Sequence, residues 1–226
     1  QPRRQVRRLS QEILGGGVCR RADAVRGHRH CVLFGLEADA YALERGLETV
    51  EPEYFYTERR RKQWEKMRGQ EDSVLDHSDT EETQGTVGAV ARDRRGNLAA
   101  ATSTGGLVNQ APGRVGDTPI VGAGTWADNA VAAISATGKG DAFLRVSFVR
   151  RVADLVELAG LSGQGAGVRA LEEVATVGGV GGCIGITAGG EVFLPFNSAN
   201  MVRGWALERE PVALAMALED WTVLAP

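Results

Sequence analysis

The sequence is poor in the residues that build metal centres and disulfide frameworks. Its three cysteines, Cys19, Cys31 and Cys183, are widely spaced and form no CxxC pair. An odd number of scattered cysteines argues against a disulfide framework and against a structural zinc site. The common motifs of phosphate, zinc and nucleophilic-serine sites (P-loop, HExxH, GxSxG) are missing as well. We therefore expect no cofactor, no metal site and a reducing compartment.

Long hydrophobic runs and a strong overall charge are also missing. No apolar run approaches the roughly 20 residues that span a bilayer, and the first residues lack the apolar stretch of a secretory signal. The formal net charge of −3 gives no general reason to expect nucleic acid or a membrane as a partner. These absences predict a cytoplasmic protein with neither kind of partner.

Glycine, in contrast, is abundant. The chain has 30 glycines against 7 prolines, and most of the glycines follow residue 85. Such a composition indicates many tight turns and places where the backbone approaches another group closely. With 43% hydrophobic and 24% charged residues, the 226-residue chain is long enough for one domain with a substantial core.

Three segments differ in texture. Residues 1–31 are basic and irregular, with eight arginines against Glu12 and Asp23, and no structure is predicted for them. In residues 32–85, Val32–Gly35 predicts a short strand or turn, and two helices are expected at Ala38–Leu47 and Glu58–Arg68. The polar, acidic stretch 68–85 is typical of an exposed linker that a protease could reach.

Residues 86–226 have a different pattern, in which strands precede and follow helices. The expected strands are 86–93 paired with 98–102, then 130–136, and finally 183–187 paired with 192–196. Helices are expected at Asp141–Leu158, which has apolar residues at helical spacing, and at Ala166–Thr176. This order predicts an α+β fold made of layers of sheet and helix.

The chemistry-bearing candidates are clusters of hydroxyl and glycine residues. They are TSTGG at 102–106, GRVGD at 113–117 and SATGKGD at 135–141. Each cluster alone is more often a turn with hydroxyl-to-backbone hydrogen bonds than a site.

Taken together, and in this order after Gly85-Thr86-Val87-Gly88, the clusters resemble the plant-type asparaginase/isoaspartyl peptidase family of N-terminal-nucleophile hydrolases. The similarity covers about residues 32–208. It implies a four-layer αββα sandwich, here incomplete at its N-terminus, and a precursor that cuts itself between Gly85 and Thr86. It also implies two parts, with 32–85 as the end of an α-subunit plus linker and 86–226 as the β-subunit, in a homo-oligomer of αβ units.

Thr86 is the catalytic nucleophile that the resemblance implies. A hydroxyl alone is a weak nucleophile, but an N-terminal threonine carries its own base. The reference pKa of an α-amine is roughly 7.7–8.0, so much of it can accept a proton near neutral pH. No histidine is required, and the chain has only His28, His30 and His77.

The remaining roles also follow from the resemblance. Thr104 matches the threonine that helps activate the nucleophile, and Thr137 and Gly138 match the donors that stabilise the oxyanion. Arg114 and Asp117 match the pair that holds the α-carboxylate and α-amino group of a substrate, because a guanidinium fork fits a carboxylate and a carboxylate fits an ammonium. Gly140 matches a further substrate-contacting backbone position.

These matches imply an amidohydrolase that acts on L-asparagine, on β-aspartyl dipeptides, or on both. Glycosylasparaginases usually have Asn in place of Gly106, and both they and taspase-type endopeptidases typically have Asp before the nucleophile, where this chain has Gly85. The tail at 178–205 and the residues 74–78 are similar to bacterial isoaspartyl peptidases. The asparaginase/isoaspartyl branch is therefore favoured over those two branches.

The beginning of the chain departs from the family. Family precursors start with an HGGAG-type strand, several helices and a sodium-binding loop, and residues 1–31 match none of these. The alternatives are a truncated, catalytically inactive relative, a mispredicted gene product, or a basic arm that binds nucleic acid.

Overall fold

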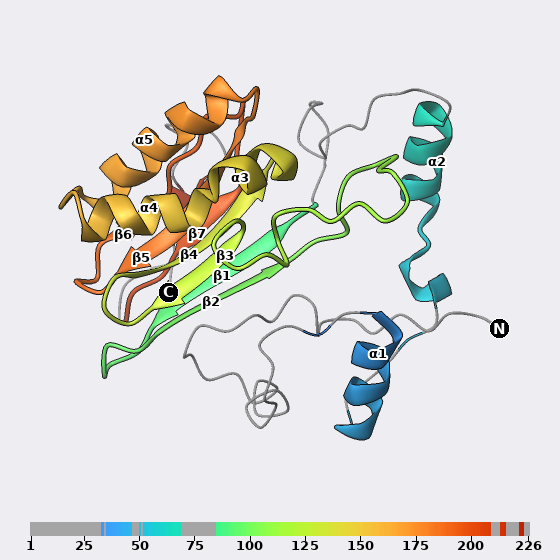
Figure 1. Ribbon diagram of the computed structural model, residues 1–226, viewed down its shortest axis with the longest axis horizontal. Coiled ribbons are helices and arrows are strands. Elements are labelled where there is room, and N and C mark those ends of the chain that lie inside the picture. The colour runs from blue at the N-terminus through green and yellow to red at the C-terminus, as the bar shows by residue number, and fades with distance from the viewer. Residues whose placement is uncertain are drawn as a thin grey trace.

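The computed structural model describes residues 33, 35–46, 50, 52–68, 85–208, 213–215 and 222–223. The basic segment 1–31, residues 32 and 34 of the expected 32–35 strand or turn, and the linker residues 69–84 lie outside this set. Within it the chain is α+β, with antiparallel sheets and helices (Figure 1). This agrees with the fold class that the order of the elements predicted.

The centre of the fold is a four-stranded antiparallel sheet with the order β3-β4-β5-β6. Its strands are β3 (Thr125–Asp128), β4 (Ala132–Gly138), β5 (Gly181–Thr187) and β6 (Val192–Phe193). Strand β4 pairs with β5 along its whole length, from Ala132 opposite Thr187 to Gly138 opposite Gly181. Residues of β4 are buried on both of its faces, so this strand lies between two layers.

One of these layers is the hairpin of β1 (Val87–Arg92) and β2 (Leu98–Ser103). Its turn is closed by Asp93, whose carboxylate accepts hydrogen bonds from the backbone N–H groups of Arg95 and Asn97. The hairpin packs on the face of β4 that carries Ser135, because a Cβ placed on Gly88 would collide with the hydroxyl of Ser135. Gly88 therefore permits the close approach of the two sheets.

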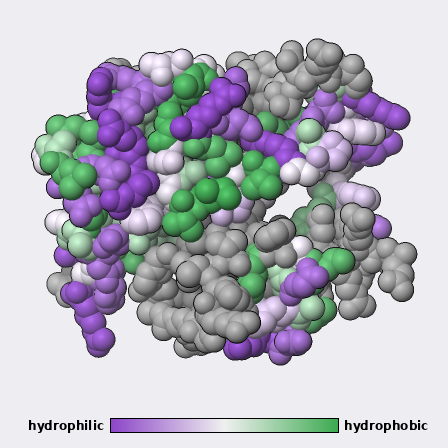
Figure 2. Space-filling view, viewed as in Figure 1, coloured by the Kyte–Doolittle hydropathy of each residue, from purple (hydrophilic) through white to green (hydrophobic). Residues whose placement is uncertain are grey.

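The other layer consists of helices α3 (Gly140–Val146), α4 (Phe148–Glu157) and α5 (Gly163–Thr176). They cover the opposite face of the sheet in Figure 1, and the main core lies between them and the sheet. The alternate residues Ala132, Ile134 and Ala136 of β4 belong to this core. Charged side chains occupy the outer sides of α4 and α5, in the purple upper-left region of Figure 2, as expected of amphipathic helices.

The single helix expected at Asp141–Leu158 is wrong, because Ser147 interrupts it with a left-handed backbone (φ +50°). In a continuous helix, Phe143 and Phe148 would point about 140° apart. The break instead stacks their rings with centroids 4.4 Å apart and leaves both fully buried. Burial of two phenylalanines outweighs the cost of one left-handed serine, which is about 1–2 kcal/mol.

Helix α5 begins three residues earlier than the expected Ala166, at Gly163. The side chain of Ser162 accepts a hydrogen bond from the Gly165 N–H, and the carboxylate of Glu191 accepts from the N–H groups of Gly163 and Gln164. Glu191 lies in the β5–β6 turn, so the acid that caps this helix comes from a distant part of the chain.

The two earlier helices agree with their predictions to within a few residues. Helix α1 spans Gly35–Glu44 and α2 spans Glu58–Met67, with a short 3₁₀ turn, η2, at Pro52–Phe55. The helix expected at Ala38–Leu47 thus begins earlier than predicted. Asn109 donates a side-chain hydrogen bond to the Met67 carbonyl at the end of α2, which joins this helix to the loop after β2.

Strand β3 was not predicted, since its four residues are too few to show an alternating pattern. A third antiparallel sheet, β7-β8-β9, is formed by Arg203–Trp205, Ala213–Ala215 and Thr222–Val223.

Candidate active site

Thr86 and Thr104 face each other across the open end of the β1–β2 hairpin. The pair Val87 and Ser103 is the last in the hairpin register, so the residues just beyond it lie opposite each other. The Thr86 hydroxyl donates a hydrogen bond to Oγ1 of Thr104 over 3.0 Å. Oγ1 of Thr104 also accepts from the Gly106 N–H over 3.0 Å. Thr104 is thereby fixed next to the predicted nucleophile.

Thr137 and Gly138 end strand β4, and only Lys139 separates them from helix α3. A Cβ on Gly138 (φ +153°) would collide with the Val180 carbonyl, so only glycine fits at this position. Gly88 lies over Ser135, and β1 begins at the end of the sheet where β4 runs into α3 (Figure 1). Thr86, two residues before Gly88, and Thr137, two residues after Ser135, therefore belong to the same end of the sandwich.

Asp117 and Gly140 are packed together close to Arg114. Asp117 is 7% exposed, and its Oδ2 is buried without a hydrogen-bond partner in the described structure. A Cβ on Gly140 would collide with Oδ1 of Asp117 and lie 3.0 Å from the Arg114 guanidinium. Nε of Arg114 is likewise buried without a partner among the described residues. The two predicted head-group residues thus present unsatisfied polar atoms of opposite charge.

Burial raises the pKa of Asp117 to about 6, although the nearby Arg114 lowers it in part. An ionised carboxylate that lacks a full set of partners is costly in such a place. A cation beside Asp117 would stabilise the charged form. This electrostatic environment suits an ammonium group.

The structure pairs Arg114 with a residue that was not predicted. Its Nη2 lies 2.7 Å from Oδ2 of Asp141, in the first turn of α3, and its Nη1 donates to Oε1 of Gln110 over 3.2 Å. The hydrogen bond from Arg114 holds the pKa of Asp141 below its ordinary value. Asp141 ends the SATGKGD cluster, but nothing in that local pattern marks it as the partner of an arginine 27 residues away.

Gln110 connects the two halves of the site. Its Oε1 accepts from Arg114 and from the Leu107 N–H, and a Cβ on Gly106 would collide with its side-chain amide. Gly106 also has φ +83°, which favours glycine. Gly106 is the position at which glycosylasparaginases usually have Asn. A side chain at this position would disturb Gln110, the partner of Arg114.

We expect Gly106→Ala to raise the KM for a substrate carrying an α-carboxylate several-fold. Alanine would displace Gln110 and leave the Arg114 guanidinium less well oriented. Gly160→Ala is the matched control, since Gly160 has φ +64° and nothing within 4 Å of its Cβ position. Steady-state kinetics should show a larger KM increase for Gly106→Ala, and an equal increase in both variants would contradict this reading.

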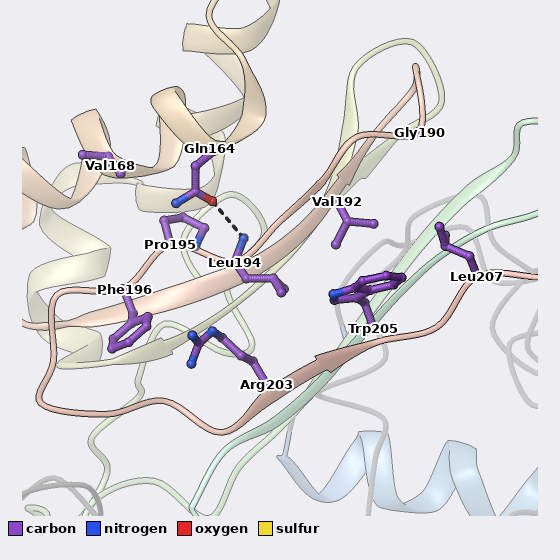
Figure 3. A pocket seen from close by; sticks show the side chains of 10 residues that line it. All are labelled: Gln164, Val168, Gly190, Val192, Leu194, Pro195, Phe196, Arg203, Trp205 and Leu207. Atoms are coloured by element: carbon purple, nitrogen blue, oxygen red, sulfur yellow. Dashed lines mark hydrogen bonds between the residues drawn. The ribbon is translucent and has the colours of Figure 1, made fainter. Parts of the chain in front are cut away.

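A pocket of about 600 Å³ lies elsewhere, between α5, β6 and β7 (Figure 3). Its lining is mostly apolar, with Arg203 as its one charged residue, and includes no predicted site residue. Arg203 is buried, lies over the Phe196 ring at 4.6 Å and donates to the Met201 carbonyl. Since the pocket contains no nucleophile or carboxylate, the candidate chemistry remains at the Thr86 end of the sheets.

Two further findings concern metals and membranes. Over the described ranges, no cluster of three or more His, Cys, Asp or Glu side chains could hold a metal ion. None of the helices described is long and apolar enough to cross a membrane.

Cys183 is a buried free thiol, and burial raises its pKa. Cys19 and Cys31 lie outside the residues that the structure describes.

Comparison with known proteins identifies the family to which this chain belongs. A family model described as "Asparaginase" matches residues 20–214. The match is longer than the expected similarity over 32–208. It includes residues 20–31 of the basic segment, which were not expected to match the family. The protein is therefore a member of the asparaginase family of hydrolases. This confirms the resemblance that was based on the hydroxyl and glycine clusters after Thr86.

Named relatives agree. The chain is 47% identical over 181 residues to an isoaspartyl peptidase of Escherichia coli K12, covering 78% of this chain and 56% of that protein. It is 46% identical to an isoaspartyl peptidase of Salmonella typhimurium, with 78% and 58% covered. An isoaspartyl peptidase/L-asparaginase of Bos taurus is 41% identical over 190 residues, with 80% and 58% covered. The chain therefore spans a little over half of the length of these relatives.

Proposed function

We propose that this protein is a self-cleaving amidohydrolase that acts on L-asparagine, on β-aspartyl dipeptides, or on both. The observation that carries the proposal is the hydrogen bond between Thr86 and Thr104. Thr86 is the residue that follows the peptide bond to be cut. Relatives named isoaspartyl peptidase or isoaspartyl peptidase/L-asparaginase support the same reaction class.

The first step is the cut before Thr86. While Gly85 is attached, the nitrogen of Thr86 is an amide and cannot act as a base. Oγ1 attacks the Gly85 carbonyl carbon, and the carbon–nitrogen bond between Gly85 and Thr86 breaks as the nitrogen takes up the hydroxyl proton. Water then hydrolyses the resulting ester, which leaves a carboxylate at Gly85 and a free amine at Thr86. That amine then becomes the base for each turnover.

In turnover, the Thr86 amine takes the hydroxyl proton as Oγ1 attacks the side-chain carbonyl carbon of the substrate. Thr137 and Gly138 donate to the oxygen that becomes negatively charged, a contribution of roughly 3–4 kcal/mol for each donor. The carbon–nitrogen bond breaks, and the leaving nitrogen takes up the proton to depart as ammonia or as the amine of the second amino acid of the dipeptide. Water then hydrolyses the Thr86 ester and releases aspartate.

The buried carboxylate and guanidinium select the substrate. Asp117 receives the α-ammonium, and Arg114 receives the α-carboxylate in exchange for part of its pairing with Asp141. Gly140 leaves room for the head group because its missing side chain would fill the space against Asp117. A molecule without a free α-amino acid group leaves these charges unpaired and is rejected.

The remaining features of the proposal concern the whole enzyme. We place it in the cytoplasm as a homo-oligomer of αβ units, with 32–85 as the end of the α-subunit and 86–226 as the β-subunit. The sheet-on-sheet layers with helices on one face support a four-layer αββα sandwich. No cofactor or metal takes part in the proposed steps.

Two measurements test the proposal. Intact mass spectrometry of the purified protein should show two fragments that meet at the 85–86 bond. Aspartate release from L-asparagine and from β-aspartyl-leucine should then report the two activities separately. An uncut chain after long incubation, with no aspartate from either compound, would instead favour an inactive relative.

A further inference from the structure

A chain of buried hydroxyl groups connects the two sheets beneath the candidate site. The hydroxyl of Thr102, on β2, contacts Oγ1 of Thr125, on β3, and lies 2.7 Å from Oγ of Ser135, on β4. Oγ1 of Thr125 donates to the Thr118 carbonyl over 3.4 Å. All four residues are 3% exposed, so water does not compete for these bonds.

The direction of donation along this chain of hydroxyl groups follows from counting protons. Each hydroxyl has one proton to donate, and the proton of Thr125 is used on the Thr118 carbonyl, which can only accept. Thr102 must therefore donate to Thr125, and Ser135 must donate to Thr102. The order is Ser135 to Thr102 to Thr125 to the backbone at Thr118, with every proton committed to one partner.

Except for β3, the segments that this hydroxyl chain touches also carry a predicted site residue. Ser135 lies two residues before Thr137, and Thr102 lies two residues before Thr104. Side chains two residues apart on a strand point to the same face, so Ser135 and Thr137 share a face of β4, whereas Thr104 lies one residue beyond the end of β2. Thr118 follows Asp117 directly, and Gly88, which packs on the Ser135 hydroxyl, lies two residues after Thr86.

We infer that Ser135, Thr102 and Thr125 are positioning residues for the proposed reaction. This inference rests on the proposed function. The three hydroxyls hold the β1–β2 hairpin, strand β4 and the loop of Asp117 in one fixed arrangement. A directional chain of this kind has a single low-energy arrangement, whereas apolar contacts alone would allow the two sheets to slide. The three hydroxyls act through Thr86 and Thr104 and do not contact the substrate.

The test removes one hydroxyl while keeping the shape of the side chain. Thr102→Val deletes the central link, and Thr102→Ser retains it. Thr187→Val is the matched control, because Thr187 is also buried and its hydroxyl also accepts a hydrogen bond, from the Glu191 N–H, but it lies outside the hydroxyl chain. Ser135→Ala, which deletes only the terminal donor, replaces Thr102→Val if that variant does not fold.

Crystal structures provide the readout that does not depend on activity. In Thr102→Val the separation of Oγ1 of Thr86 and Oγ1 of Thr104 should increase from 3.0 Å to beyond about 3.5 Å, while Thr187→Val keeps it. A separation that stays at 3.0 Å in Thr102→Val, or lengthens equally in both variants, overturns the inference. This readout decides the matter even if the wild-type chain releases no aspartate, in which case the proposed function fails separately.

Kinetics provide the second readout in an active chain. Thr102→Val should lower kcat by roughly 10- to 100-fold and leave KM within about threefold, since the substrate head group is held elsewhere. Thr102→Ser should restore kcat, and Thr187→Val should lower only the melting temperature. Equal kcat values for Thr102→Val and Thr187→Val would show that the hydroxyl chain is merely structural.

Discussion

Thr86→Ala should leave the chain uncut at the 85–86 bond and lower kcat by roughly 10⁴-fold or more, the loss typical when a catalytic nucleophile is removed. Both effects have one cause, because the same hydroxyl attacks Gly85 during maturation and the substrate during turnover. The side chain is half-buried and ends at the hydrogen bond to Thr104, so alanine should change the free energy of unfolding little. Intact mass and aspartate release measure the two effects.

Two further variants sharpen this result. Thr86→Ser keeps the hydroxyl, so it should still be cut and should retain measurable turnover at a reduced rate. Thr176→Ala removes an exposed hydroxyl that bonds only within helix α5, and it should behave as wild type. Normal cleavage of Thr86→Ala at the same bond would assign the nucleophile to another residue.

Asp117→Asn should lower kcat/KM by roughly 10²- to 10³-fold, while the protein becomes more stable above pH 6. Loss of a buried partner for an ammonium group costs about 3–4 kcal/mol of binding. The stability effect has the opposite sign, because the folded state raises the pKa of Asp117 from 3.8 to about 6. Ionising this carboxyl in the folded protein therefore costs on the order of 2–3 kcal/mol.

The pH dependence follows from the same shift. Between pH 3.8 and about 6 the folded protein holds the Asp117 proton more tightly than the unfolded chain, so the free energy of unfolding falls as pH rises through this range. Above pH 6 the penalty is constant. Since only the carboxylate binds an ammonium, kcat/KM should rise with pH through about 6, separately from the rise near 8 that reports the Thr86 amine.

The matched control is Asp128→Asn. Asp128 is exposed, accepts from the Ala130 N–H in a turn and has no place in the site. It should keep both the rise in kcat/KM near pH 6 and the decline in stability across that range, and Asp117→Asn should lose both. Melting temperatures and kcat/KM across pH 4–9 measure these effects. A rise near pH 6 that persists in Asp117→Asn would assign that titration to a different group.

Much of the candidate site follows from short stretches of sequence. The turn at Asp93–Asn97 and the alternating strands predict a hairpin, and its register alone places Thr86 opposite Thr104. Glycines at 88, 106 and 138 mark backbone that must approach other groups closely. The roles of Arg114, Asp117, Thr137 and Gly140 came from the resemblance and stay predictions, although the structure gathers Arg114, Asp117 and Gly140 in one cluster.

Features that depend on distant partners could not be predicted in this way. The apolar spacing of 141–158 is equally good for one helix or for two, and only the stacking of Phe143 on Phe148 favours the break at Ser147. The Arg114–Asp141 pair joins residues that no periodicity relates. Burial of Asp117, and hence its raised pKa, depends on elements that pack around it from other parts of the chain.

By itself, the sequence determined the fold class, because turn chemistry and strand alternation are local properties. The order of its motifs also determined the family, and the resemblance to that family implied Thr86 as the candidate nucleophile. The tertiary structure decided which charges meet, which hydroxyls are buried and in which direction they donate. Thr102 and Ser135 each belong to a hydroxyl cluster that is visible in the sequence, and Thr125 lies in a strand that was not predicted. Nothing in the sequence shows that these three hydroxyls bond to one another, because they meet only when two sheets pack together. Close packing between distant segments turns them into one connected support beneath Thr86 and Thr104.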